Sequence, residues 1–595
     1  MLRFRVSRDE FDPVPPAYSL GGILSSVRIP RPGRLAACTA LALSAGMLLA
    51  GTASADEAPT APKATVEAAK PSAGKPSGAL PQRIHRSSAV AAATAAKPRL
   101  DLNKDGSTDL LYRGVDNQTY LETWTEKTNP AYANSFGAYK EIITPGDLDG
   151  NGIPELLTVQ PDGTLSLYAN MTNDGFTAYP NWSGGGWNAY NKIVGAADLT
   201  GDGKGDVLAR TPGGDLYLYP GKGVAAGDPF SGRIKVGGGW QAYDQLVGAN
   251  DMNGDGFGDV VARTPGGDLY FYAGTGDAAA PLKSRVRIGG GWTAYNQILS
   301  IDDGNGDGYA DLAARSNGGT LYYYAADGKG NFQSPQLMGT GWEYTQAFSG
   351  SGANATPVKN AIVGRDAKGT LWQYYTEYNG QLSQRYRASD DGVFANARHL
   401  AFAASISGGL YGDLLQWDSG RLYIGVDLSD AGGGWGGFTT LVGPGDLNND
   451  GKNDLLARDG SGTLYLYRGY GNGYQFASRL RIGGGWNAYD RIVGAGDLTG
   501  DGLTDIVART GDGKLYLYQG TGVSTSPFKS RVYVGPGWQQ FRNIAAPGDL
   551  NGDGRADLIA TNSRGEAFRY DSNGYGGFKS RVKLGDGWNA YRDLF

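Results

Sequence analysis

One stretch of the sequence reads Asp198-Leu-Thr-Gly-Asp-Gly-Lys-Gly-Asp206, and closely similar stretches return through the chain. Seven further copies begin at Asp101, Asp147, Asp251, Asp303, Asp446, Asp497 and Asp549. Their first residues lie 46 to 53 positions apart, except for a gap of 143 positions between Asp303 and Asp446. A fixed period of this length indicates a repeat architecture. The long gap leaves room for two more units that have lost the loop.

Short runs of alternating apolar residues flank each acidic loop. In the unit around Asp497, one run ends at Val493 and leads into the loop, and others follow at 505–509, 515–518 and 531–534. Four short antiparallel strands in about 50 residues are typical of one blade of a β-propeller. We therefore predict an all-β fold, a β-propeller of four-stranded antiparallel blades.

The repeated region starts and stops in complementary halves of a blade. Residues 587–595 read as a first strand without a loop after it, and the region from residue 98 opens with a loop that has no first strand before it. Eight loops and two degenerate units, at about 349–435, make about ten blades. We prefer two tandem five-bladed propellers, at 98–348 and 349–595, with residues 349–355 as a linker. One larger ring, or a ring of seven or eight blades with atypical units, is the alternative.

Residues 1–55 have the pattern of a secretory signal peptide. Three arginines precede an apolar run at 35–50, and Ala53-Ser54-Ala55 follows, so we expect secretion with cleavage after Ala55. A lipoprotein attachment at Cys38 is the alternative reading. No other segment could span a membrane. Residues 56–97 are rich in Ala, Pro, Lys, Ser and Thr, and we expect a disordered tether.

Composition and charge narrow the classes of partner. Cys38 is the only cysteine, so the secreted part has no disulfide to stabilise it. The chain carries a formal charge of -5, and residues 1–55 hold six arginines against three acids, which leaves -8 for the rest. Taken alone, this charge argues against nucleic acid or an anionic membrane as a partner. We expect a monomer.

The acidic loops carry the ligand types that calcium prefers. Ca²⁺ takes six to eight oxygen ligands, and in the copy that begins at Asp549 the side chains at positions one, three, five and nine can converge. Gly554 permits the sharp turn, and the carbonyl of Arg555 is the expected backbone ligand. Asp-Gly pairs can also serve as plain turn formers, but three clustered carboxylates repel one another unless a cation lies among them. The sequence therefore predicts up to eight bound Ca²⁺ ions.

The predicted calcium ligands occupy the same four positions of each loop. They are Asp101, Asn103, Asp105, Asp109, Asp147, Asp149, Asn151, Glu155, Asp198, Thr200, Asp202, Asp206, Asp251, Asn253, Asp255, Asp259, Asp303, Asn305, Asp307, Asp311, Asp446, Asn448, Asp450, Asp454, Asp497, Thr499, Asp501, Asp505, Asp549, Asn551, Asp553 and Asp557. The loops with Thr200, Thr499 or Glu155 depart from the pattern, and we expect weaker sites there. The eight loops hold 24 of the 59 acidic residues, so full loading would change the net charge to about +8.

These loops resemble the FG-GAP or VCBS repeats of integrin-α-type propellers, in which the calcium loop joins the first two strands of a blade. A second element, Gly-Gly-Gly-Trp, resembles the Gly-Gly-Trp element of tachylectin-type five-bladed lectins. That resemblance implies sugar sites between blades, with ligand-binding tryptophans at Trp187, Trp240, Trp292, Trp435 and Trp486. The other interpretation of each tryptophan is that it packs in the core between two blades.

The expected function is that of an extracellular binding module, for carbohydrate in a lectin-like manner. A protein-recognition or adhesion module is the alternative, since the sequence does not separate glycan from protein partners. We do not expect an enzyme, because the repeated region has one histidine, His399, and no cysteine. A hydrolase site in the degenerate units, around Trp372, Tyr374, Tyr375 and Trp417, is the remaining alternative.

Overall fold

The computed structural model describes residues 76–80, 97–116, 118–124, 139–172, 175, 179–353, 359–407, 412–425 and 428–595. These residues all belong to one compact unit. The predicted signal peptide and most of the predicted tether lie outside them. Within the described ranges, no helix is both long and apolar enough to cross a membrane.

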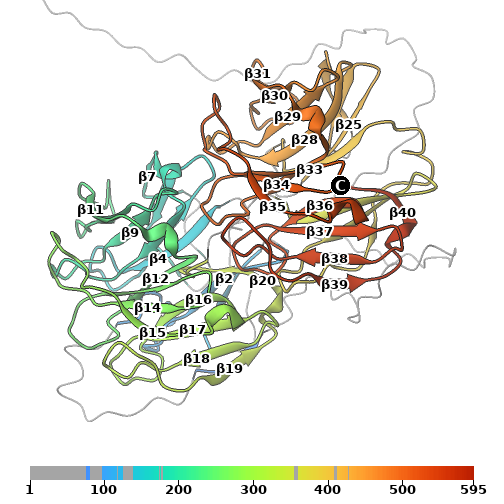
Figure 1. Ribbon diagram of the computed structural model, residues 1–595. Helices are drawn as coiled ribbons and strands as arrows, with labels where there is room; N and C mark the ends of the chain where they lie inside the picture. Colours follow the sequence, from blue (N-terminus) through green and yellow to red (C-terminus); the bar gives the residue numbers. More distant parts are fainter. Residues whose placement is uncertain are drawn as a thin grey trace, which may run out of the picture. The chain divides into compact units, whose positions relative to one another are not determined.

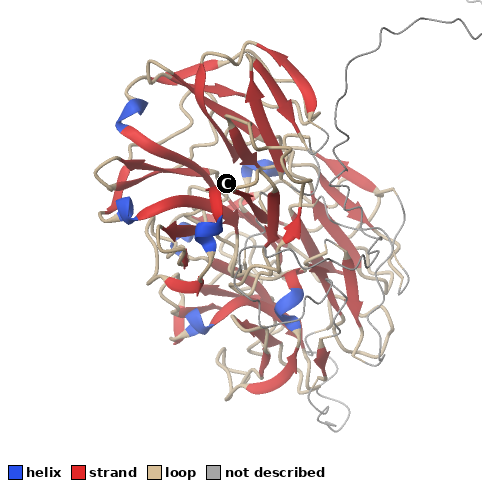
Figure 2. Cartoon of the chain, turned by 90° about the vertical axis from the view of Figure 1, so that its right-hand side faces the viewer, coloured by secondary structure: helices blue, strands red, loops and turns tan. Residues whose placement is uncertain are grey.

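Strands dominate the described chain, and the helices are single short turns (Figure 2). The strands form ten antiparallel sheets, which confirms the predicted all-β fold of four-stranded blades. The seven 3-10 helices within the described ranges each begin at a tryptophan: η1 (Trp187–Ala189), η2 (Trp240–Ala242), η3 (Trp292–Ala294), η4 (Trp342–Tyr344), η5 (Trp486–Ala488), η6 (Trp538–Gln540) and η7 (Trp588–Ala590).

The first five sheets use strands β1 to β20, and we call them the first set. They are β20 (Thr345–Phe348), β2 (Leu110–Gly114) and β3 (Thr119–Glu122); β4 (Glu141–Gly146), β5 (Glu155–Val159), β6 (Leu165–Tyr168) and β7 (Trp182–Gly184); β8 (Lys192–Gly195), β9 (Val207–Arg210), β10 (Leu216–Tyr219) and β11 (Ile234–Gly237); β12 (Gln245–Asn250), β13 (Asp259–Arg263), β14 (Leu269–Tyr272) and β15 (Val286–Gly289); and β16 (Tyr295–Asp302), β17 (Asp311–Ser316), β18 (Leu321–Tyr324), β19 (Gln336–Thr340) and β1 (Ser77–Gly78).

The other five sheets use strands β21 to β40, and we call them the second set. They are β40 (Tyr591–Leu594), β21 (Ala361–Asp366), β22 (Leu371–Tyr375) and β23 (Tyr386–Arg387); β24 (Leu400–Ala403), β25 (Asp413–Asp418), β26 (Arg421–Ile424) and β27 (Ser429–Gly433); β28 (Phe438–Gly445), β29 (Asp454–Asp459), β30 (Leu464–Tyr467) and β31 (Leu480–Gly483); β32 (Tyr489–Gly496), β33 (Asp505–Thr510), β34 (Leu515–Tyr518) and β35 (Val532–Gly535); and β36 (Phe541–Gly548), β37 (Asp557–Asn562), β38 (Ala567–Tyr570) and β39 (Val582–Gly585).

In each set, the last strand of the segment completes the first sheet. β20 pairs with β2, with Phe348 opposite Tyr112, and β40 pairs with β21, with Leu594 opposite Gly364. Figure 1 shows β36 to β39 as one stack of red strands, with β40 belonging to the next sheet. The half-blades at the two ends of the repeated region therefore do not complete each other: β20 completes the sheet of β2, and β40 completes the sheet of β21.

Ten hydrophobic clusters join neighbouring sheets, and their order is cyclic. In the first set, clusters join successive sheets from β2 through β16, and a further cluster around Tyr112 and Leu299 joins the last sheet to the first. The second set repeats this arrangement, closing through Tyr374 and Trp588. Each set is thus a cycle of five blades whose core lies between the sheets.

The structure differs from the predicted disorder of residues 56–97 at one point. Ser77 and Gly78 form β1, which pairs antiparallel with β19 opposite Thr340 and Gly339. β19 is the outer strand of its blade, so its free backbone groups can accept one more strand. A polar, Gly-containing segment can supply those hydrogen bonds without an apolar side chain, which is why composition alone did not predict it.

Candidate functional site: the repeated acidic loops

The acidic loops lie where the first strand of a blade turns into the second. Seven of the eight join such a pair directly, for example β32 to β33, and the loop at 101–109 precedes β2. In most blades the second strand begins at position nine of the loop, as β33 does at Asp505. The loops therefore recur at one place in each blade that has one.

All eight loops share a hydrogen bond across the turn. The carboxylate at position one accepts the backbone N–H of the glycine at position six, and that glycine has a positive φ, which strains any other residue. The eight pairs are Asp101 with Gly106, Asp147 with Gly152, Asp198 with Gly203, Asp251 with Gly256, Asp303 with Gly308, Asp446 with Gly451, Asp497 with Gly502 and Asp549 with Gly554, at 2.7 or 2.8 Å.

All eight loops also share a bond from position two to position nine. One oxygen of the position-nine carboxylate accepts the backbone N–H of position two. The pairs are Leu102 with Asp109, Leu148 with Glu155, Leu199 with Asp206, Met252 with Asp259, Gly304 with Asp311, Leu447 with Asp454, Leu498 with Asp505 and Leu550 with Asp557. Positions one and nine are thus held in place by the backbone of their own loop.

Six of the position-nine carboxylates have a second structural partner that sequence reasoning missed. Their other oxygen accepts a backbone N–H fifteen residues later, just beyond the third strand. An example is Asp505, which accepts from Gly520 at 2.8 Å. The same bond holds Asp206, Asp259, Asp311, Asp454 and Asp557. In the sequence, the constant spacing between this acid and the end of the third strand was the signal that could have revealed this hydrogen bond.

The position-nine carboxyls are electrostatically unfavourable as anions in the absence of a cation. Burial raises the pKa of each, and neighbouring carboxylates of the same loop raise it further. The pKa reaches about 6 in Asp206, about 7 in Asp109 and Asp311, and about 8 in Glu155, Asp259 and Asp454. The same causes raise the pKa of Asp505 and Asp557 well above its usual value.

Some of the predicted ligand oxygens are buried without any hydrogen-bond partner. They are Asp109 Oδ1, Glu155 Oε1 and Asn448 Oδ1. In the loop at 147–155, single oxygens of Asp147, Asp149 and Glu155 lie within 4.8 Å of one another. Buried acceptors of this kind are costly unless a donor or a cation reaches them. This loop brings its acids together although its sequence departs from the others.

The loop at 549–557 differs because protein cations already contact it. Arg555 donates to Asp553 at 2.7 Å, and Lys579 lies 3.4 Å from the same carboxylate. These two cations offset part of the negative charge that a metal ion would otherwise neutralise. We therefore expect this loop to bind a cation more weakly than the loop at 147–155.

The five predicted ligand-binding tryptophans all lie between blades. Trp187, Trp240, Trp292, Trp435 and Trp486 are 5 to 7% exposed. Each packs against a tyrosine of the following blade with ring centroids 4.6 to 4.8 Å apart. These positions match the core-packing interpretation and leave little of each side chain accessible to a ligand.

A cleft of about 440 Å³ opens beside one of these tryptophans. It is lined by residues of two neighbouring blades, among them Gly483, Gly484, Gly485, Trp486, Tyr518, Pro527, Phe528, Lys529 and Arg531. Arg531 donates to Tyr489, which shares a hydrogen bond of 2.7 Å with Tyr518. The volume and the mixture of aromatic and polar groups suit a small ligand.

A row of buried arginines, which sequence reasoning also missed, holds the tryptophan turns. Arg509 ends the second strand of its blade and donates to the carbonyls of Trp538 and Phe541 at 3.0 and 2.6 Å. The same paired contacts are made by the buried Arg210, Arg263 and Arg315 and by the half-buried Arg458, and Arg365 donates in the same way to the carbonyls of Phe394 and Ala397 in a degenerate unit. An arginine at this point of most units, about 30 residues before the next turn, was the signal.

The degenerate units place their polar and aromatic residues in packing roles. His399 stacks on Trp417 with ring centroids 4.9 Å apart, and Tyr374 shares a hydrogen bond with Tyr591. Trp372 donates to Asp366 at 2.9 Å. One unit keeps part of the loop, because Asp413 begins β25 and accepts the N–H of Ser407. The loss of the loop is therefore incomplete there.

Comparisons with known proteins agree with the repeat. The FG-GAP-like repeat family matches residues 147–209, 446–508 and 497–560. Among curated proteins, none matches the sequence. Similar solved structures include an Agrocybe aegerita lectin described as specifically recognising non-reducing terminal N-acetylglucosamine, at 17% identity over 76% of this chain and 92% of that one, with a TM-score of 0.23. The BP39L lectin from Burkholderia pseudomallei is 13% identical over 67% of this chain and 99% of that one, with a TM-score of 0.21.

Proposed function

Since three stretches of this chain match the FG-GAP-like repeat family, we propose that it is a secreted, calcium-binding module that binds a partner outside the cell. The observation that carries the calcium proposal is the shared geometry of the eight loops. Backbone N–H groups hold positions one and nine, but they do not neutralise three crowded carboxylates. A hard divalent cation would do so, and oxygen atoms are the ligands it prefers.

The chain's own residues fit such an ion. In the loop at 147–155, Asp147, Asp149 and Glu155 would hold it, because their oxygens already converge. Elsewhere the orphaned oxygens of Asp109 and Asn448 are suited to the same role. Bound calcium would neutralise the carboxylates and fix the turn between the first two strands. In a chain whose secreted part lacks cysteine, this would replace disulfides as the stabilising link.

The partner we favour is a carbohydrate, bound in the clefts between blades. The cleft beside Trp486 combines aromatic edges with Arg531, Lys529 and Ser526, which can bond sugar hydroxyls. Two other blade junctions repeat its Trp, Tyr, Tyr and Arg set, with Arg233 bonded to Tyr190 and Arg285 bonded to Tyr243. Repeated weak sites on one protein would raise avidity for a polymeric glycan.

A glycan array tests this proposal, probed with the intact protein in calcium and in EGTA. We expect binding in calcium and its loss in EGTA. The variant Arg531→Ala should weaken binding, while Arg564→Ala, whose side chain is 79% exposed between β37 and β38 of another blade, should leave it unchanged. A blank array in a protein that still folds with calcium would overturn the carbohydrate proposal and favour protein recognition.

A further inference from the structure

Three of the acidic loops make contacts far beyond their own blade. They are the loops of the second set, at 446–454, 497–505 and 549–557, and each is bonded to a residue of the first set. Asn188 donates to the carbonyl of Asn449 at 2.7 Å, and Asn449 donates back to the carbonyl of Asn188 at 2.8 Å. The contact is therefore reciprocal and specific.

The other two loops accept bonds of the same kind. Asn191 donates to the carbonyl of Asp501 at 2.8 Å, and Asn296 donates to the carbonyl of Asn551 at 2.7 Å. In all three loops the acceptor carbonyl belongs to position three, four or five. These positions lie between the aspartate at position one and the glycine at position six, whose hydrogen bond shapes the turn.

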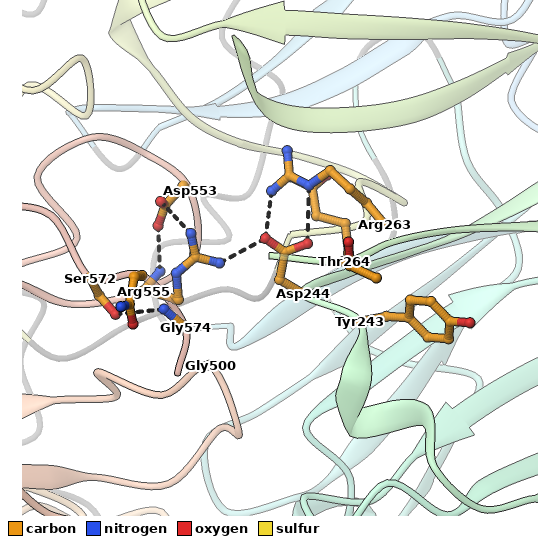
Figure 3. A network of polar contacts seen from close by, with 12 residues as sticks. Tyr243, Asp244, Arg263, Thr264, Gly500, Asp553, Arg555, Ser572 and Gly574 are labelled. Carbon is orange, nitrogen blue, oxygen red and sulfur yellow. Dashed lines mark hydrogen bonds and ion pairs between the residues drawn. The ribbon is translucent and has the colours of Figure 1, made fainter. Parts of the chain in front are cut away.

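A buried chain of charges reinforces the third contact. Asp244 of the first set lies between Arg263 and Arg555, at 2.8 Å from each (Figure 3). Arg555 continues to Asp553 of its own loop. All four side chains are at most 5% exposed. Breaking such a pair would leave a buried charge without a partner, so the contact is selective for this arrangement of the loop.

The space beside these contacts is closely filled. A cavity of about 30 Å³, lined by Lys140 and Glu141 of the first set and by Tyr378 and Asp549 of the second, has room for about one water molecule. Among the described residues, no hydrogen bond or ion pair joins the loops at 147–155, 198–206 and 251–259 to the second set. The two groups of loops thus differ in surroundings although they share one internal geometry.

We infer that the calcium loops at 446–454, 497–505 and 549–557 are the docking surface through which the second set binds the first, and that calcium binding and docking are thermodynamically linked. This inference rests on the proposed calcium function. Without a cation, the crowded carboxylates of the loops at 446–454 and 497–505 repel and these turns relax, which moves their carbonyls away from Asn188 and Asn191. By linkage, docking must in turn strengthen calcium binding in these loops.

The experiment uses small-angle X-ray scattering to compare a triple variant in the loops of the second set with a triple variant in the loops of the first set. The loops at 198–206 and 497–505 begin with the same six residues, Asp-Leu-Thr-Gly-Asp-Gly, which makes them matched. We expect Asp446→Asn with Asp497→Asn and Asp549→Asn to raise the radius of gyration in calcium, as EGTA does to the unaltered protein. Asp147→Asn with Asp198→Asn and Asp251→Asn should not raise it.

A third variant removes the contacts but keeps every calcium ligand. Asn188→Ala with Asn191→Ala and Asn296→Ala should raise the radius of gyration and weaken calcium binding at part of the sites by about fivefold or more. Calorimetric titration of the same samples distinguishes a failure of the docking inference from a failure of the proposed calcium function. If no calcium binds, the proposed function fails. If calcium binds but neither EGTA nor the second-set variants change the radius of gyration, the docking inference alone is overturned.

Discussion

Asp497 accepts the backbone N–H of Gly502 at 2.7 Å, five residues later in the same loop. The bond recurs at the same two positions in all eight loops, so the turn has one geometry wherever it occurs. The carboxylate therefore shapes the loop as well as offering a ligand. Substitutions at position one should affect both calcium binding and local order.

Replacing one position-one aspartate should remove one calcium ion. We expect Asp147→Asn to lower the number of bound Ca²⁺ ions by one, because the loop at 147–155 has three converging acids. Calorimetric titration measures this number. The control is Asp228→Asn, an exposed aspartate outside the loops, which should leave it unchanged. An equal number of ions in both variants would remove this loop from the calcium proposal.

A fall in pH should change stability in opposite senses without and with calcium. The folded pKa of position-nine acids such as Asp454, about 8, exceeds the usual Asp value of 3.8. The calcium-free folded state therefore binds more protons than the unfolded state, and its melting temperature should rise as pH falls from about 8 to about 5. With saturating calcium the trend should reverse, because protons compete for the ligands. If the melting temperature changed with pH in the same direction without and with calcium, this prediction would be contradicted.

Removing a tryptophan between blades should cost stability. Trp486 is 6% exposed and packs on Tyr518, so Trp486→Ala should lower the free energy of unfolding by about 3 to 5 kcal/mol. Tyr575→Ala, at a residue that is 67% exposed, should change it by less than about 0.5 kcal/mol. Urea denaturation measures both. Unchanged stability with lost glycan binding would instead assign Trp486 to the ligand.

The buried arginines should contribute more to the free energy of unfolding than exposed arginines do. Arg509 holds two carbonyls of the next turn and is 5% exposed. Arg509→Met should lower the free energy of unfolding by about 3 kcal/mol, since two buried carbonyls and Asp490 lose a charged partner. Arg481→Met, at an exposed position of β31, serves as the control in the same denaturation series. An equal loss of unfolding free energy in the two variants would contradict a structural role for the buried arginines.

Features with a local cause could be predicted from the sequence. The strand Leu515–Tyr518 follows from alternation, and the turn at Gly502 follows from the spacing of acid and glycine. The half-blades at 98 and 595 indicated that a later strand completes an earlier sheet, but the structure joins β20, and not β40, to β2. Each of these depends on residues close together in the chain or on the repeat period.

Features with distant partners could not be predicted. Asp244 and Arg555 are 311 residues apart, and nothing in either unit indicates that they meet. The tryptophans illustrate a different limit, because a Gly-Gly-Gly-Trp pattern suits both a sugar site and a packed junction. Burial of Trp187 to 7% depends on the neighbouring blade, which a single unit does not contain.

The most direct measurement of the central claim is a thermal melt of the intact protein in calcium and in EGTA, with bound calcium counted by calorimetry. The eight loops predict that several Ca²⁺ ions bind, that EGTA lowers the melting temperature, and that added calcium restores it. A protein that binds no calcium and melts at the same temperature in both conditions would contradict the account.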